Sequence, residues 1–130
     1  MGAQRFTWGD NMASVLIVED EALIAFALVD DLAVRGHLVR DASDGAAALD
    51  VLKDFSPDVL VTDMTMPRLD GAGLIRYLRA RAGPRLPIIL LTGVPEATLP
   101  ADLGYDAYLS KPVDNDMLGS TVARLAAAAH

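Results

Sequence analysis

The chain has 130 residues, a length that suits a single domain. Hydrophobic residues make up 52% of it and the net charge is −7 at pH 7, which argues against a disordered chain and against direct binding to nucleic acid. Cysteine is absent, which excludes disulfides and suits a reducing cytoplasm, the expected location. The longest apolar run, residues 22–29, is too short to cross a bilayer, so no membrane insertion is expected.

The first 13 residues contain one basic residue, Arg5, and no apolar core, so they do not resemble a signal peptide. We expect residues 1–13 to be a disordered extension or an artificial leader, with Met12 as a candidate natural start. The folded domain is expected over residues 14–130.

Strand and helix patterns alternate along this domain. Continuous apolar runs such as 14–18 predict strands buried on both faces. Glycine or proline ends several helices, and Asp70 is a candidate N-cap. In chain order we predict a strand at 14–18, a helix at 21–35, a strand at 37–42, a helix at 44–54, a strand at 58–62, a helix at 71–82, a strand at 87–92, a strand at 106–110 and a helix at 114–127.

Strands that alternate with helices predict a parallel sheet, because each crossover requires a covering helix. Right-handed crossovers then give a doubly wound α/β sandwich. Ligands of such folds bind at the carboxyl ends of the strands, where the strand order switches direction.

Charged and polar side chains follow the predicted strands at this edge. Glu19 and Asp20 follow the first strand, Asp63 follows the third, Thr92 ends the fourth and Lys111 follows the fifth. Each alone has an ordinary explanation, such as a turn, a helix cap or a surface position. Four strand ends that each supply a suitable group favour one shared site.

The three acids would repel one another, by about 4 kcal/mol for two carboxylates at ~4 Å in an effective dielectric near 20. A divalent cation such as Mg²⁺ or Mn²⁺ would offset this repulsion, bound by Asp20, Asp63 and a backbone carbonyl, with Glu19 acting through water. Asp63, held by a central strand, is the candidate nucleophile for a phosphoryl group. Lys111 and Thr92 would contact the phosphoryl oxygens.

These motifs resemble the receiver domain of two-component response regulators over about residues 14–125. The similar features are the acidic pair, a D-x-x-M-P motif at Asp63, a D-G pair at 70–71, the hydroxyl of Thr92 and a K-P pair at 111–112, where Pro112 follows the lysine. The resemblance implies a flavodoxin-like fold of five parallel strands in the order 2-1-3-4-5.

The resemblance also implies a function. A histidine kinase or histidine phosphotransfer protein would phosphorylate Asp63 with Mg²⁺, and the backbone carbonyl of Thr65 would be the third protein ligand of the metal. Thr92 and Tyr108 would then move and alter a surface that a downstream protein recognises. Such a domain takes part in its own phosphorylation and dephosphorylation but is not a conventional enzyme.

The sequence departs from the family in one segment. Only 18 residues separate Thr92 from Lys111, and they include Pro95 and Pro100. We therefore expect the fourth helix to be short or irregular. Gly93 is small, as the family requires beside the site. The chain ends soon after the last helix, so a single-domain receiver is expected.

The helix at 21–35 carries more apolar residues than one helix face can bury. An exposed patch there would dock a kinase helix bundle or a second copy of the domain in a homodimer.

A single feature of the sequence argues against each of three alternative functions. A pseudo-receiver that binds partners without phosphorylation usually lacks an acid or the lysine, and both are present here. An aspartyl phosphatase of the haloacid-dehalogenase type would need another aspartate where Thr65 stands. A flavin-binding module would place its phosphate beside Glu19 and Asp20, which would repel it.

Overall fold

The computed structural model describes residues 12–81 and 85–129. The predicted extension falls almost wholly outside the described residues, but Ala13 is buried and its amide donates to Nδ1 of His37 at 3.0 Å. The elements are β1 (Ser14–Val18), α2 (Ala22–Val34), β2 (Leu38–Ala42), α3 (Gly45–Val51), β3 (Val59–Thr62), α4 (Gly71–Ala80), β4 (Ile88–Thr92), the 3-10 turn η1 (Glu96–Thr98), β5 (Ala107–Ser110) and α5 (Asn115–Ala129).

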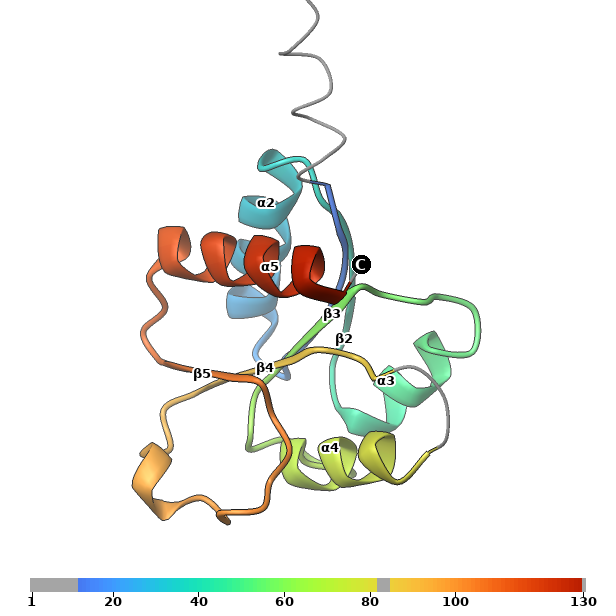
Figure 1. The fold of residues 1–130 in the computed structure, drawn as a ribbon, viewed down its shortest axis with the longest axis vertical. Helices are drawn as coiled ribbons and strands as arrows, with labels where there is room; N and C mark the ends of the chain where they lie inside the picture. Colours follow the sequence, from blue (N-terminus) through green and yellow to red (C-terminus); the bar gives the residue numbers. More distant parts are fainter. Residues whose placement is uncertain (1–11, 82–84, 130) are drawn as a thin grey trace, which may run out of the picture.

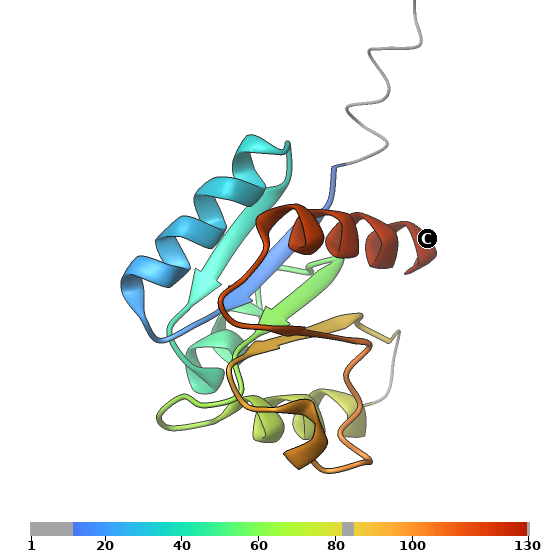
Figure 2. The same cartoon turned by 90° about the vertical axis from the view of Figure 1, so that its left-hand side faces the viewer.

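The five strands form one parallel sheet in the order β2-β1-β3-β4-β5, which confirms the predicted topology (Figure 1). Helices α2 and α5 cover one face of the sheet, and α3 and α4 cover the other, as Figures 1 and 2 show. The molecule is thus the expected three-layer sandwich, and the carboxyl ends of all five strands point to one edge.

Alternate residues of β1 explain why the sheet is buried on both faces. Val15 and Ile17 pack into the core beneath α2 and α5, whereas Leu16 and Val18 pack into the core beneath α3 and α4. Every residue of β3 and of β4 is buried as well. The central strands therefore hold the residues at their carboxyl ends rigidly.

Two aspartates fix the starts of helices near this edge. Asp70 caps α4 by accepting the amide of Gly73 at 2.8 Å, which confirms its predicted role, and Asp44 caps α3 by accepting the amide of Ala47 at 2.8 Å. None of the helices within 12–81 and 85–129 is both apolar enough and long enough to cross a membrane.

The connection from β4 to β5 contains only the single 3-10 turn η1 and no α-helix, as expected from its length and prolines. Arg79 of α4 anchors the end of this connection. Its guanidinium donates to the carbonyl of Gly104 at 2.8 Å and to that of Leu86 at 2.7 Å, and it pairs with Asp106 at 2.9 Å. The contacts of Arg79 thus help to fix the β4–β5 connection in place, although it contains no packed α-helix.

Candidate functional site

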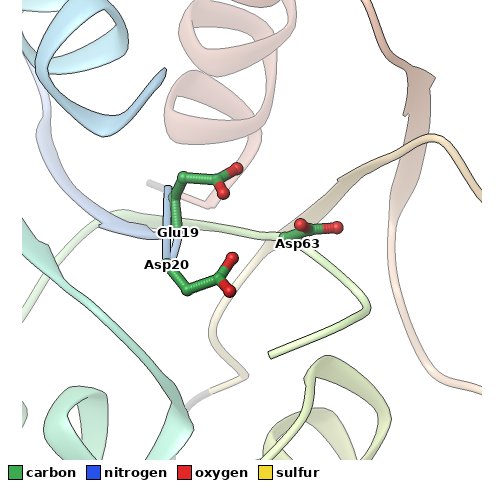
Figure 3. A group of neighbouring side chains, drawn as sticks. All are labelled: Glu19, Asp20 and Asp63. Carbon is green, nitrogen blue, oxygen red and sulfur yellow. The ribbon is translucent and has the colours of Figure 1, made fainter. Parts of the chain in front are cut away.

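Three carboxylates meet at the carboxyl ends of β1 and β3. Glu19 and Asp20 follow β1, Asp63 follows β3, and one oxygen of each lies within 4.8 Å of the others (Figure 3). The backbone holds this arrangement, because the amide of Asp63 donates to the carbonyl of Val18 and that of Glu19 donates to the carbonyl of Ala42, both at 3.0 Å. The structure therefore brings together the acids that the sequence places at separate strand ends.

Lys111 completes the group from the end of β5. Its Nζ lies 2.6 Å from Oε1 of Glu19 and 3.0 Å from Oδ2 of Asp63. The amide of Lys111 donates to the carbonyl of Thr92 at 3.0 Å, which fixes the lysine beside β4. Pro112 follows through a cis peptide bond and is exposed. The pairing of Lys111 with Glu19 was not foreseen, since the sequence suggested only a water-mediated role for Glu19.

The loop after β3 positions Asp63. The residue is only 9% exposed, and its Oδ1 accepts the amide of Met64 at 2.6 Å. The amide of Gly71 donates to the carbonyl of Met64 at 2.8 Å and closes the loop. A β-carbon at Gly71 would lie 2.2 Å from the carbonyl oxygen of Asp63, so only glycine allows this approach.

The charges at the site do not balance. Three carboxylates face one ammonium group, which leaves a formal charge of −2 when all are ionised. Burial raises the pKa of Glu19 above 4.5 despite its hydrogen bonds from Lys111 and the amide of Glu21. Burial alone would lower the pKa of Lys111, but hydrogen bonds to the two carboxylates outweigh it and raise this pKa above 10.5. The site thus retains a charged lysine and excess negative charge.

Carboxylate oxygens are ligands that Mg²⁺ prefers, and the negative charge left over suits a dication. Asp20 is exposed at the mouth of the site and Glu19 is buried. Thr65 lies two residues beyond Asp63 in the same loop, with an exposed side chain. The donor set therefore fits a hydrated divalent cation.

The predicted switch residues lie on β4 and β5. Thr92 is 1% exposed, and its Oγ1 accepts the amide of Val94 at 3.2 Å. Tyr108 is half-buried, and its hydroxyl donates to the carbonyl of Val94 at 2.5 Å. Both side chains therefore contact the same residue of the β4–β5 connection. Gly93, which lies between Thr92 and Val94 in the sequence, is exposed and has open space around the position of a β-carbon.

An apolar groove borders the site on the α2 side. It has a volume of about 690 Å³, and its apolar lining includes Leu23, Ile24, Ala27, Leu91, Pro112 and Val113. Lys111 of the acid site also lines it. Leu23 is 86% exposed and Phe26 is 70% exposed, so the surplus apolar residues of α2 do face outward.

Comparison with known proteins agrees with this architecture. The model of the response regulator receiver domain matches residues 15–123. The response regulator MprA of Mycobacterium avium is 42% identical over 101 residues, which cover 75% of this chain and 44% of that protein. The chain thus spans less than half the length of such curated relatives.

Two solved receiver domains are similar to this chain over almost their full length. The receiver domain of the Francisella response regulator 1452 has a TM-score of 0.84 and 30% identity, covering 91% of this chain and 99% of that one. The receiver domain of the sensor histidine kinase PA1611 from Pseudomonas aeruginosa has a TM-score of 0.77 and 29% identity, covering 88% and 97%. That structure has a magnesium ion coordinated in its active-site cleft.

Proposed function

This chain belongs to the family of response regulator receiver domains, and from that premise we propose that it is a phosphoacceptor signalling domain of a two-component system or phosphorelay. Asp63 accepts the phosphoryl group from a phosphohistidine of a histidine kinase or a histidine phosphotransfer protein in the cytoplasm. The observation that supports this most directly is the position of Asp63, which is nearly buried, 3.0 Å from Lys111 and within 4.8 Å of two further acids.

The chemical step is a displacement at phosphorus. A carboxylate oxygen of Asp63 forms the new P–O bond, the P–N bond to the histidine breaks, and its electron pair stays on the imidazole nitrogen. Little covalent assistance is needed, so alignment and charge neutralisation provide most of the catalysis. The rigid end of β3 aligns Asp63, and the ammonium of Lys111 moves from the carboxylate to the new phosphoryl oxygens.

A divalent cation, Mg²⁺ or Mn²⁺, neutralises charge on the phosphoryl oxygens when it is bound. Asp20, Asp63 and the backbone carbonyl of Thr65 would hold it, with Glu19 contributing through water. The similar receiver domain from Pseudomonas aeruginosa has a magnesium ion in its active-site cleft, which supports magnesium as the cation.

The response to phosphorylation passes through Thr92 and Tyr108. The hydroxyl of Thr92 donates to a phosphoryl oxygen and gives up its contact with the amide of Val94. Because Tyr108 bonds to the same residue, its hydroxyl loses or shifts its acceptor as the connection moves. To change a population from 1:99 to 99:1, phosphorylation must favour the new state by about 5.5 kcal/mol. A downstream protein reads the altered surface.

The exposed residues of α2 are the proposed contact for the phosphodonor. Leu23 and Phe26 lie beside the acid site and border surfaces that include Asp20 and Lys111. A helix bundle of a kinase covering them would bring its phosphohistidine to Asp63. The domain acts as a substrate and switch in this reaction, and not as a conventional enzyme.

Intact-mass spectrometry tests the proposal. The protein is incubated with Mg²⁺ and acetyl phosphate, and the expected result is a gain of one phosphoryl group that EDTA prevents. Asp63→Asn should abolish the gain, whereas Asp54→Asn, which removes an exposed carboxylate on another part of the chain, should not. A parent protein that gains no mass would favour a pseudo-receiver, and an adduct that survives in Asp63→Asn would place the acceptor elsewhere.

A further inference from the structure

Arg68 has an unusual backbone conformation in the loop that follows Asp63. Its φ is 66°, and it is the one non-glycine residue with positive φ in the part of the chain that the structure describes. Residues other than glycine adopt this region uncommonly and at a cost in free energy. Glycine would make the same turn without that cost, so the side chain of Arg68 is the feature that needs an explanation.

That side chain binds a buried carboxylate from another segment. Nε of Arg68 lies 2.7 Å from Oδ2 of Asp44, and Nη2 lies 3.0 Å from Oδ1. Such a two-point pairing fixes orientation as well as distance. Asp44 is 4% exposed and is itself held by the amide of Ala47 at the start of α3. The pKa of Asp44 is lowered, first by the hydrogen bonds from Arg68.

A backbone contact joins the same two segments. The amide of Gly45 donates to the carbonyl of Leu69 at 2.9 Å. A β-carbon at Gly45 would lie 2.4 Å from that oxygen, so the two segments approach more closely than any residue other than glycine would allow. Residues 68–69 are therefore tied to residues 44–45 by one side-chain pair and one backbone hydrogen bond.

The other end of the loop is tied to the phosphorylation site. The amide of Met64 donates to Asp63, and the carbonyl of Met64 accepts from Gly71. The arc of residues 65–67 thus spans two anchored points. The carbonyl of Thr65, the third ligand in the proposed cation site, lies within this arc.

We propose that Arg68 is a positioning residue for the divalent cation: its ion pair with Asp44 holds in place the arc of residues 65–67, which carries the carbonyl of Thr65 that would bind the cation. The inference rests on the proposed function, because it concerns the metal of the same site. The change in cation affinity when Arg68 is replaced has a definite sign. Removing a positive charge near an acidic site should strengthen cation binding by Coulomb attraction alone, whereas loss of positioning should weaken it.

Isothermal titration of the unphosphorylated full chain with MgCl₂ distinguishes the Coulomb effect from the loss of positioning. Arg68→Gly keeps the favourable backbone and removes the ion pair, and we expect its Kd for Mg²⁺ to rise by about tenfold, as for other residues that orient metal ligands. Arg68→Lys keeps the charge but cannot pair at two points, and its Kd should rise by a smaller factor. Arg76→Gln removes an exposed arginine from α4 and should leave the Kd unchanged or slightly lower.

A second set of variants tests the role of Asp44, the residue that pairs with Arg68. Asp44→Asn keeps an oxygen to cap α3 but weakens the pair, so it should raise the Kd, and combining it with Arg68→Gly should add nothing further. A Kd for Arg68→Gly at or below that of the parent overturns the inference. If circular dichroism shows that Arg68→Gly has lost its fold, Arg68→Lys decides by the same criterion.

If the proposed function itself is wrong, the titrations will give a different result. A parent protein that binds no Mg²⁺, or whose binding survives both Asp20→Asn and Asp63→Asn, contradicts the cation site and this inference with it. Binding that those substitutions abolish but that Arg68→Gly leaves intact contradicts only the role of Arg68.

Discussion

Glu19 and Lys111 are 92 positions apart in the sequence, yet their side chains form a 2.6 Å ion pair at the centre of the acid site. Glu19 is 3% exposed, and its second oxygen accepts the amide of Glu21. The carboxylate therefore holds the lysine beside Asp63 from a fixed position. This arrangement places a buried acid under opposing influences, since burial disfavours its charge and the lysine favours it.

The first prediction concerns this buried acid. Because the pKa of Glu19 is raised above 4.5 in the fold, the folded protein binds the proton more tightly than the unfolded chain does. Its contribution to stability is therefore largest below pH 4.5 and falls as the pH rises through the raised value. Glu19→Gln removes this titration, so the Tm of the variant minus that of the parent should be greater at about pH 7 than at about pH 4. Thermal unfolding at constant ionic strength measures it, and a difference that shrinks with rising pH would contradict it.

The second prediction has the opposite sign. Burial lowers the pKa of His37 below 6.5, and its Nδ1 accepts the amide of Ala13. The fold therefore prefers the neutral ring, and the stability it contributes is complete above pH 6.5 and is lost as the pH falls through the lowered value. His37→Asn should reduce this loss of stability in acid. An identical pH dependence of stability in the parent and in His37→Asn would exclude this role for His37.

The third prediction tests the close approach at Gly71. Gly71→Ala forces a β-carbon against the carbonyl of Asp63, so we expect a loss of about 1–3 kcal/mol in unfolding free energy and a weaker phosphorylation of Asp63. Gly93→Ala is the matched control, because its β-carbon would meet no atom within 4 Å and should change stability by less than about 0.5 kcal/mol. Urea unfolding measures both variants. Equal unfolding free energies for Gly71→Ala and Gly93→Ala would show that the loop can accommodate the extra β-carbon without loss of stability.

The fourth prediction separates docking from chemistry. Leu23→Asn combined with Phe26→Ser replaces two exposed apolar side chains, so stability should change by less than about 0.5 kcal/mol for each substitution. Phosphorylation by acetyl phosphate should be unchanged, whereas transfer from the cognate kinase should slow by about tenfold, equivalent to about 1.4 kcal/mol. Ala33→Ser, at an exposed position near the other end of α2, serves as the control. Equal slowing with both donors would place the defect at Asp63.

The sequence allowed most of the architecture to be predicted, for a physical reason. Strands buried on both faces are continuous apolar runs, and residues such as Asp63 and Lys111 stand directly after them, so parallel strands bring them to one edge. The strand order itself came from the resemblance to the receiver family, and the pairing of strands confirms it. The short η1 was also predictable, because few residues and two prolines leave no room for a helix.

The polar contacts between segments that are distant in the sequence could not be predicted. The pairs Arg68 with Asp44 and Arg79 with Asp106 depend on how long side chains cross between segments, and local sequence carries little information about those paths. The same holds for Glu19, whose preference for Lys111 depends on its burial. The close approach of Gly71 was invisible for a related reason, since the D-G pair indicates a helix start but not which atoms lie opposite it.

The connection from β4 to β5 is secured at both ends, by Tyr108 on Val94 near its start and by Arg79 on Gly104 near its finish. A second tyrosine, Tyr105, reaches Glu96 of η1 at 2.7 Å. This flank therefore presents an irregular connection held by side-chain contacts in place of an α-helix. If a downstream protein recognises this flank, we expect it to contact the connection itself, and a partner that requires an α-helix at this position should not bind.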